Sequence, residues 1–159
     1  MRVADLLPRI HVGDEALKDI EMWHYEHSVD TTANQETLWR LWSDIPGGPR
    51  WNEGIAQIEF GGPFVAGSKF TMTPPGQDPI EMRIIEVVPG ELFTDGMDAG
   101  DFLVRTIHRL DDARDGRTRV TYRTEITGPA ADDVGPMLGP EITADFPQVI
   151  AALVKLAEA

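Results

Sequence analysis

Between Ile55 and Thr127 the sequence repeats one pattern, a short apolar run followed at once by glycine, proline or aspartate. The runs are IAQIEF, SKFTM, IEMRIIEVV, LFTDGM, FLVRTIHRL and RVTYRTEIT. Turn residues at such short intervals are typical of hairpins. No segment between the runs is long enough for the crossover helix that parallel strands require. The pattern therefore predicts a meander of about six antiparallel strands.

A further strand and a short helix are predicted before this meander. Apolar and polar residues alternate from Met22 through WHYEHSV, which indicates a strand. In NQETLWRLWSD, apolar residues recur at helical spacing after the candidate N-caps Thr31, Thr32 and Asn34. Residues 1–21 share neither pattern, so we expect an N-terminal extension of uncertain order there.

The end of the chain, PEITADFPQVIAALVKLAEA, predicts an amphipathic helix, because its apolar residues recur at spacings of three and four. Pro147 interrupts this pattern. We expect one long helix kinked at Pro147, and the alternative is a helix that restarts with Asp145 as its N-cap. A sheet that buries one face against such a helix has an α+β fold.

These elements, in this order, resemble the START-like (SRPBCC) superfamily, and most of all its polyketide cyclase/dehydrase branch. The resemblance is carried by HYEHSVDTTANQETLWRLWSD, by Trp51, by Gly67 in VAGSKF and by EVVPGELF. It covers residues 22–159 and implies a single helix-grip domain. In that fold a curved antiparallel sheet of about seven strands wraps around a long C-terminal helix, with two short helices after the first strand.

The resemblance also implies a pocket for a small hydrophobic or aromatic molecule, lipid-like or polyketide-like, between the sheet and the C-terminal helix. Alternation along each strand indicates which side chains line it. By the same alternation, Arg83 and Glu86 are expected on opposite faces of their strand. The expected ligand-binding residues are Trp51, Phe70, Met72, Met82, Ile84, Phe102, Val104, Thr106, Thr124, Phe146 and Ile150.

Two residues of this expected lining are candidates for acid–base catalysis. His108 has an ordinary pKa near neutrality and lies among apolar neighbours. Tyr122 could donate a hydrogen bond to a ligand carbonyl and stabilise an enolate, as the cyclisation of a polyketone requires. Each residue also has a purely structural explanation, as a hydrogen-bonded core histidine or as a tyrosine whose hydroxyl is satisfied inside the protein. The first hypothesis is thus a protein that binds a small hydrophobic molecule, to which the resemblance adds cyclase or dehydratase activity.

Three tryptophans lie close together in LWRLWSDIPGGPRW. Trp39 and Trp42 are three residues apart on the predicted short helix, so they share a face and are expected to anchor the core. Trp51 follows the Gly-Pro break, where a loop can cover the mouth of a cavity.

We find no sequence pattern for a metal or a cofactor, and we expect neither. His24 and His27 are three apart on a strand, so their side chains point to opposite faces. Asp95, Asp98 and Asp101 in DGMDAGD lie in a predicted turn and lack the spacing of a calcium loop. Phosphate-binding glycine loops and the GxSxG elbow do not occur.

The formal net charge of −13, from 27 acidic and 14 basic residues, disfavours nucleic acid as a partner. The sequence contains no apolar run of about 18 residues and no signal-peptide core, so we expect no membrane span. The absence of cysteine suits a reducing compartment, and we expect a cytoplasmic protein.

Two other hypotheses remain open at this stage. The chain could be a protein-interaction module of the same fold, associated with a chaperone or the ribosome, whose cavity is filled by its own side chains. It could also form a homodimer in which the extension of residues 1–21 docks onto a neighbouring copy.

Overall fold

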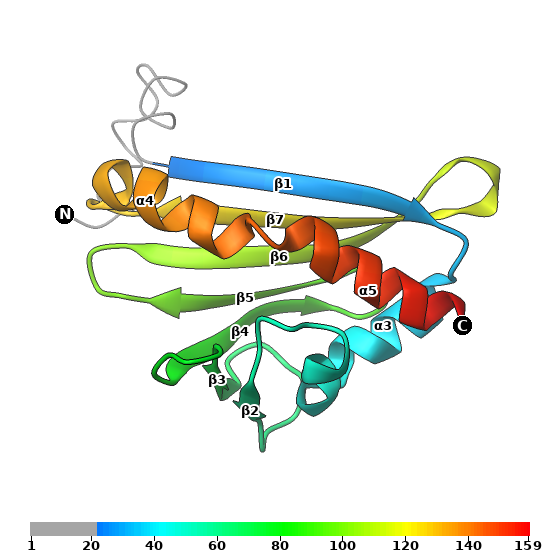
Figure 1. Cartoon of the computed structure of the whole chain (residues 1–159), viewed down its shortest axis with the longest axis horizontal. Helices are drawn as coiled ribbons and strands as arrows, with labels where there is room; N and C mark the ends of the chain where they lie inside the picture. Colours follow the sequence, from blue (N-terminus) through cyan, green and yellow to red (C-terminus); the bar gives the residue numbers. More distant parts are fainter. Residues whose placement is uncertain (1–21) are drawn as a thin grey trace.

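The computed structural model describes residues 22–159, and the predicted N-terminal extension lies outside this part. Seven strands form one sheet in the order β1-β7-β6-β5-β4-β3-β2, and all neighbours are antiparallel (Figure 1). The predicted antiparallel meander is confirmed. The strands are β1 (Met22–Thr31), β2 (Gln57–Glu59), β3 (Lys69–Thr73), β4 (Ile80–Val88), β5 (Leu92–Asp98), β6 (Leu103–Asp112) and β7 (Thr118–Thr127).

Helices cover one face of this sheet, as the helix-grip fold requires, so the predicted fold class is confirmed. The α4 and α5 helices cross the concave face one after the other, and α3 lies beside α5 (Figure 1). At the start of α3 the Oδ1 atom of Asn34 accepts a hydrogen bond from the Thr37 amide at 2.7 Å, so Asn34 is an N-cap, as predicted. The helices of residues 22–159 are α3 (Gln35–Ser43), the 3₁₀ helices η1 (Ile45–Arg50) and η2 (Arg114–Gly116), α4 (Ala131–Thr143) and α5 (Phe146–Glu158).

The C-terminal helical layer is broken before Pro147, so the expected single helix kinked at that proline is wrong. α4 ends at Thr143 and α5 begins at Phe146. In a continuous helix the ring of Pro147 would clash with the carbonyl of Thr143, four residues earlier. Pro147 lies instead in the first turn of α5, where a missing N–H costs no helical hydrogen bond. The alternative, a helix that restarts with Asp145 as its N-cap residue, is confirmed, although the Asp145 side chain makes no capping hydrogen bond.

The α4 helix begins in the sequence GPAADD, where the turn residues predicted only a loop. Two glycines one turn apart, Gly135 and Gly139, face Trp23 of β1. A Cβ atom at Gly139 would lie 2.5 Å from the indole ring, so the glycines let the helix backbone approach the sheet. A second apolar cluster under this helix includes Val104, Ile126, Ala131, Leu138 and Ile142.

The main core lies between the sheet and the α3 and α5 helices. Its fully buried members include Leu38, Trp42, Ile84, Val120, Ile150 and Leu153. Within residues 22–159, no helix combines the length and the apolar character that crossing a membrane requires.

Candidate functional site

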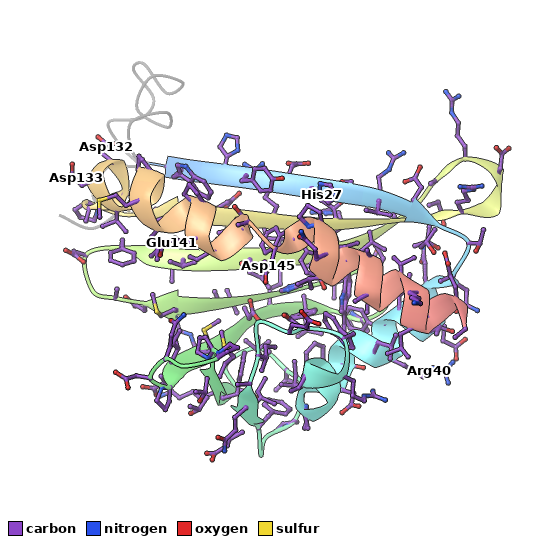
Figure 2. All side chains as sticks on the ribbon, viewed as in Figure 1. His27, Arg40, Asp132, Asp133, Glu141 and Asp145 are labelled. Atoms are coloured by element: carbon purple, nitrogen blue, oxygen red, sulfur yellow. The ribbon has the colours of Figure 1, made fainter. Side chains whose placement is uncertain are left out.

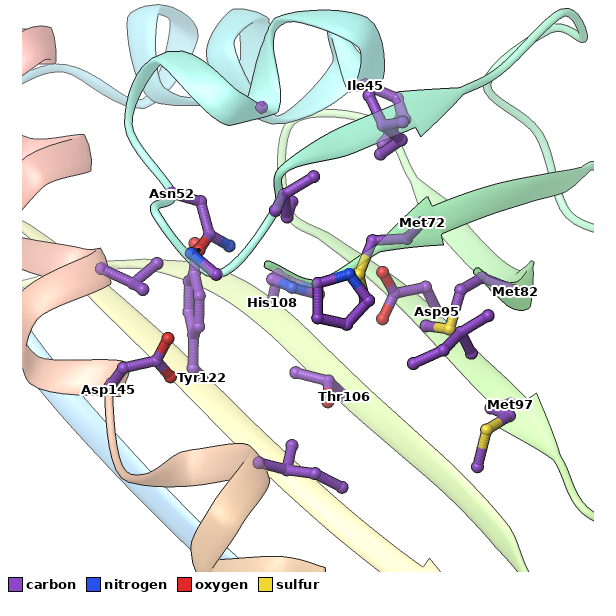
Figure 3. A pocket seen from close by; sticks show the side chains of 18 of the residues that line it. Ile45, Asn52, Met72, Met82, Asp95, Met97, Thr106, His108, Tyr122 and Asp145 are labelled. Atoms are coloured by element: carbon purple, nitrogen blue, oxygen red, sulfur yellow. Dashed lines mark hydrogen bonds between the residues drawn. The ribbon is translucent and has the colours of Figure 1, made fainter. Parts of the chain in front are cut away.

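A cavity of about 490 Å³ lies between the concave face of the sheet and the helical layer. Three parts of the chain enclose it, namely the inner face of the sheet, the segment from Asp44 to Ile55, and the α4–α5 junction (Figure 3). Small-molecule sites are typically cavities of about 300–1,000 Å³ with mostly apolar walls. The apolar side chains here include Trp42, Trp51, Ile58, Phe70, Met72, Ile80, Met82, Phe93, Met97, Val104, Leu138, Ile142, Phe146 and Val149.

The β6 strand places His108 on the inner wall between Phe93 of β5 and Tyr122 of β7, which are its direct cross-strand partners. The imidazole stacks on the Phe93 ring with centroids 4.0 Å apart, and its Nδ1 atom is 3.2 Å from the Phe93 carbonyl oxygen. Because a carbonyl oxygen only accepts, Nδ1 carries the proton and Nε2 presents a lone pair.

Burial lowers the pKa of His108 to about 4, although two backbone hydrogen bonds act in the opposite direction. The imidazole is therefore neutral at pH 7 and is a weak base there. Nε2 can accept a hydrogen bond from a ligand, which is a narrower role than the general acid or base expected from the sequence. Whether His108 takes part in catalysis stays a prediction.

Tyr122 is 3% exposed, and its hydroxyl oxygen accepts a hydrogen bond from Nε1 of Trp42 at 3.1 Å. Burial raises the pKa of this hydroxyl, while the Trp42 hydrogen bond lowers it and the charges of Asp95 and Asp145 raise it further. The phenol thus keeps its proton at neutral pH. Among residues 22–159 no acceptor takes that proton, so the hydroxyl can donate it to a ligand.

Asp95 is one of the polar groups of the cavity that sequence reasoning missed. The turn expected in DGMDAGD begins later, because β5 continues to Asp98 and puts Asp95 opposite Ile84 and Thr106. Its carboxyl group lines the cavity (Figure 3), and burial raises its pKa to about 7. The signal was present in the sequence, since Phe93, Asp95 and Met97 alternate on one face of the strand.

Two more carboxyl groups come from the helical side of the cavity. Glu141 and Asp145 lie on the same side of the helical layer at the α4–α5 junction (Figure 2) and line the cavity. The loop with Asn52 and Gly54 faces them, and a Cβ atom at Gly54 would lie only 3.1 Å from Oδ2 of Asp145. Burial raises the pKa of Asp145. The break before Pro147 therefore places acidic side chains at this cavity.

Most of the residues predicted to bind a ligand lie around one space. Three others, Ile84, Thr124 and Ile150, are fully buried behind the lining, and Thr124 is 2.8 Å from Thr106 through the two hydroxyl oxygens. Phe102 packs against the second apolar cluster, away from the cavity lining. The predicted residues that line the cavity are Trp51, Phe70, Met72, Met82, Val104, Thr106, His108, Tyr122 and Phe146.

The three neighbouring tryptophans divide between core and cavity. Trp42 is 1% exposed and contacts Trp39, with ring centroids 6.4 Å apart. Trp51 is half-buried at the cavity, and its indole N–H has no acceptor among the described residues. Sequence reasoning overlooked the polar residues Asp44 and Asn52 of the same segment and Gln77 of the turn between β3 and β4, which also line the cavity.

No three acidic, histidine or cysteine side chains in residues 22–159 are grouped so that they could hold a metal ion. His24 pairs with Glu125 and His27 with Tyr122 in the β1–β7 ladder. The two histidines are therefore on opposite faces of the sheet, as their spacing predicts.

The family model described as "Polyketide cyclase / dehydrase and lipid transport" matches residues 22–158. A comparison with curated protein sequences gave no match.

Solved structures with the same fold are similar at low sequence identity. The Zhui aromatase/cyclase from a Streptomyces species is 16% identical, with a TM-score of 0.70 over 86% of this chain and 94% of that one. The di-domain aromatase/cyclase StfQ of the steffimycin pathway is 13% identical, with a TM-score of 0.71 over 98% of this chain and 59% of that one. Norcoclaurine synthase from Thalictrum flavum, in complex with dopamine and hydroxybenzaldehyde, is 17% identical, with a TM-score of 0.66 over 85% and 86%. At identities this low, the similarity shows that these proteins share the fold of this chain.

Proposed function

The chain belongs to the polyketide cyclase / dehydrase and lipid transport family, and we propose that it binds a small hydrophobic or aromatic molecule, lipid-like or polyketide-like, between its sheet and its C-terminal helices. The observation that carries this proposal is the cavity of about 490 Å³, with apolar walls and a few polar groups on its inner face. Apolar walls supply affinity, and a small number of polar groups fix the orientation of a ligand.

Cyclase or dehydratase chemistry is the second part of the proposal, and the position of Asp95 and Tyr122 in one cavity favours it. A carboxyl group with a pKa of about 7 can accept a proton from a carbon next to a ligand carbonyl at neutral pH. The Tyr122 hydroxyl would donate a hydrogen bond to the carbonyl oxygen as negative charge develops there.

The resulting enolate carbon would attack a second carbonyl carbon of the same molecule and form a carbon–carbon bond. The new alkoxide would take up the proton to give a cyclic alcohol, and loss of its hydroxyl with a hydrogen of the neighbouring carbon, as water, would leave a double bond in the ring. Confinement contributes as well, because a cavity that holds a flexible chain folded makes the closure effectively unimolecular.

A protein-interaction module with a filled cavity is the competing function. Native mass spectrometry of the purified protein against fatty acids, sterols, flavonoids and aromatic polyketides separates the two. A retained or converted ligand supports the proposal. A folded protein that retains none of them would favour the interaction module.

The catalytic part has its own test, on whichever compound of that panel is converted. We expect Tyr122→Phe and Asp95→Asn to lower kcat by about 10²-fold or more, in keeping with the loss of one oxyanion donor or one general base. His108→Gln should lower the rate less, because its imidazole is neutral. If Tyr122→Phe and Asp95→Asn both convert the ligand at the parental rate, the catalytic assignment is wrong, while the binding function stands.

We also propose a cytoplasmic protein that does not bind nucleic acid, on the ground of its net charge of −13 and its lack of cysteine. Cell fractionation tests the location. For the homodimer, the mass in solution of the full chain is compared with that of a chain lacking residues 1–21, and an unchanged monomer would contradict docking through the extension.

A further inference from the structure

The polar groups that line the cavity are mostly acceptors. Asp95, Glu141 and Asp145 present carboxyl groups, and His108 presents the lone pair of Nε2. Within residues 22–159, neither lysine nor arginine lines the cavity. A ligand that satisfies these acceptors must bring hydrogen-bond donors, while the Trp51 indole N–H and the Tyr122 hydroxyl are free to bind an acceptor on the same ligand.

Asp95 is the most demanding of these groups, because it is half-buried in the cavity wall and no basic side chain among the described residues pairs with it. An unpaired carboxylate in an apolar environment is costly, and a cation beside it removes much of that cost. Its neighbours on the inner face include Met82, Met97 and Thr106, which offer no positive charge.

His108 points independently to a ligand that donates hydrogen bonds. The side chain is 9% exposed, its Nδ1 atom is already bonded to the Phe93 carbonyl, and no described residue donates to Nε2. A buried acceptor that borders a cavity and has no partner is normally satisfied by whatever occupies that cavity.

Asp95 and Asp145 flank the same space from opposite walls. Asp95 belongs to the sheet and Asp145 to the α4–α5 junction, and both carboxyl charges act on the Tyr122 hydroxyl that lies between these walls (Figure 3). A positive charge in that space would interact favourably with both carboxylates. Residues 22–159 contain no grouping of three ligating side chains that could hold a metal there, so an organic ammonium group suits this space better than a metal ion.

We propose that the ligand carries a protonated amine attached to an aromatic or other apolar ring, and that the ammonium group binds against Asp95. The ring then packs on the aromatic walls of the cavity, where Trp51, Phe70 and Phe146 also favour a nearby cation. The same walls disfavour carboxylate ligands such as fatty acids, because three unpaired carboxyl groups repel them. This inference rests on the proposed ligand-binding function and names the chemical class of the ligand.

The test compares three probes of nearly equal size, 1-naphthylmethylamine, 1-naphthalenemethanol and 1-naphthoate, by calorimetric titration of the full chain. Titration is done at about pH 8, where Asp95 is mostly a carboxylate and the amine is protonated. We expect the amine to bind about 10- to 100-fold more tightly than the alcohol, as charge-assisted hydrogen bonds do, and the carboxylate to bind most weakly. Asp95→Asn should bring the amine within about 3-fold of the alcohol, because the amide keeps the shape and loses the charge.

Asp98→Asn is the matched control. Asp98 ends the same strand, is exposed and does not line the cavity, so the preference for the amine should persist. Retained binding of the alcohol by Asp95→Asn shows that the variant is folded.

Failure of the inference and failure of the proposed function give different results. If the alcohol or the naphthoate binds as tightly as the amine, the amine ligand is wrong, while ligand binding stands. If Asp95→Asn keeps the full preference, the assignment to Asp95 is wrong. If a folded parent protein binds none of the probes and none of the mass-spectrometry panel, both the inference and the binding function fail.

Discussion

At the residue scale, the hydroxyl of Tyr122 links the core to the cavity. It accepts the indole N–H of Trp42 at 3.1 Å, and both rings are almost fully buried. Tyr122→Phe removes the acceptor and leaves that N–H unsatisfied in the core. We expect it to lower the free energy of unfolding by about 1–3 kcal/mol, measured by urea denaturation.

Tyr25→Phe is the control for this loss, because Tyr25 is 37% exposed and its hydroxyl makes no hydrogen bond with a described residue. It should change stability by less than about 0.5 kcal/mol. Equal effects of the two substitutions would contradict a structural role for the Trp42–Tyr122 hydrogen bond.

Two titrating residues of the cavity should affect stability in opposite directions as pH changes. Burial raises the pKa of Asp95 from 3.8 to about 7 on folding. The folded state therefore binds more protons than the unfolded state, and stability falls as the pH rises from about 4 to 7. Burial lowers the pKa of His108 from 6.5 to about 4, so stability increases as the pH rises from about 4 to 6.5. The two contributions oppose each other over most of this range.

The variants separate these contributions when urea denaturation is repeated across this pH range. Relative to the parent, Asp95→Asn should become more stable as pH rises from about 4 to 7, by at most about 4 kcal/mol. His108→Gln should show the opposite trend up to about pH 6.5. Asp98→Asn, at the exposed end of the same strand, is the control for replacing a carboxylate by an amide at the surface. If the difference in the free energy of unfolding between Asp95→Asn and the parent does not change with pH, the Asp95 carboxyl is not buried in solution.

Asp95 also shows what the sequence predicts poorly at this scale. Aspartate and glycine in DGMDAGD predict a turn, because both residues disfavour strands. Pairing along the whole edge of β6 keeps Asp95 in β5 instead. Tertiary pairing outweighs local preference here, so a polar residue of the inner wall was assigned to a loop. His108 and Tyr122, which lie in regular alternating strands, were predicted to face inward and do so.

At the scale of the element, α4 depends on the close approach of two glycines to Trp23. Gly135→Ala would bring a Cβ atom against the Cβ of Trp23, which cannot move without the strand. Overpacking of this kind costs about 1–3 kcal/mol, whereas alanine gains about 1 kcal/mol in helix propensity. We expect a net loss of stability in thermal unfolding, although alanine is the better helix former.

Gly61→Ala is the control, because no atom lies within 4 Å of a Cβ placed at Gly61 and its φ is ordinary. It should leave the melting temperature unchanged or slightly higher. If Gly135→Ala stabilises the protein instead, α4 does not pack on Trp23 as closely as described.

This contact explains why the sequence predicts the strands well and the start of the helical layer poorly. The strands are predicted from the alternation of apolar and polar residues and from the turn residues between them, and both signals lie within a few residues of each other in the sequence. α4 contains Pro136 and Pro140 in addition to its two glycines. Such a segment has low intrinsic helix propensity, and packing on Trp23 and the second apolar cluster stabilises it. The sequence does not show which strand the helix will contact.

Irregularities inside an element are equally hidden. Strict alternation predicts opposite faces for Arg83 and Glu86, but a β-bulge between Ile84 and Glu86 shifts the register. Arg83 pairs with Gly96 and Glu86 with Thr94, and both side chains are exposed on the outer face. A bulge inserts one residue without a strong sequence signal, and it bends the sheet around the cavity.

At the scale of the whole molecule, the cavity is too large to be a dry void in the core. At about 24 cal/mol per Å³, an empty apolar cavity of 490 Å³ would cost about 12 kcal/mol, which is comparable to the entire stability of a domain. The space must therefore exchange with solvent or hold a ligand, and the exposed residues Glu141 and Asp145 at its helical side suit an open mouth. A ligand that enters it should raise the melting temperature, because it binds only the folded state.

Met72→Trp tests whether this space is open in solution. Met72 is half-buried on β3 and lines the cavity, so a larger ring can fill the space without displacing the core. Without ligand, we expect the variant to keep the melting temperature of the parent. With 1-naphthylmethylamine, we expect it to lose most of the increase in melting temperature that the parent shows, because a filled cavity binds the amine at least about 10-fold more weakly.

Met137→Trp is the matched control, since Met137 is 75% exposed on α4, and it should respond to the amine as the parent does. A large fall in the melting temperature of Met72→Trp would mean that the cavity is closed and packed in solution. In that case the fold would serve as an interaction module with a filled core.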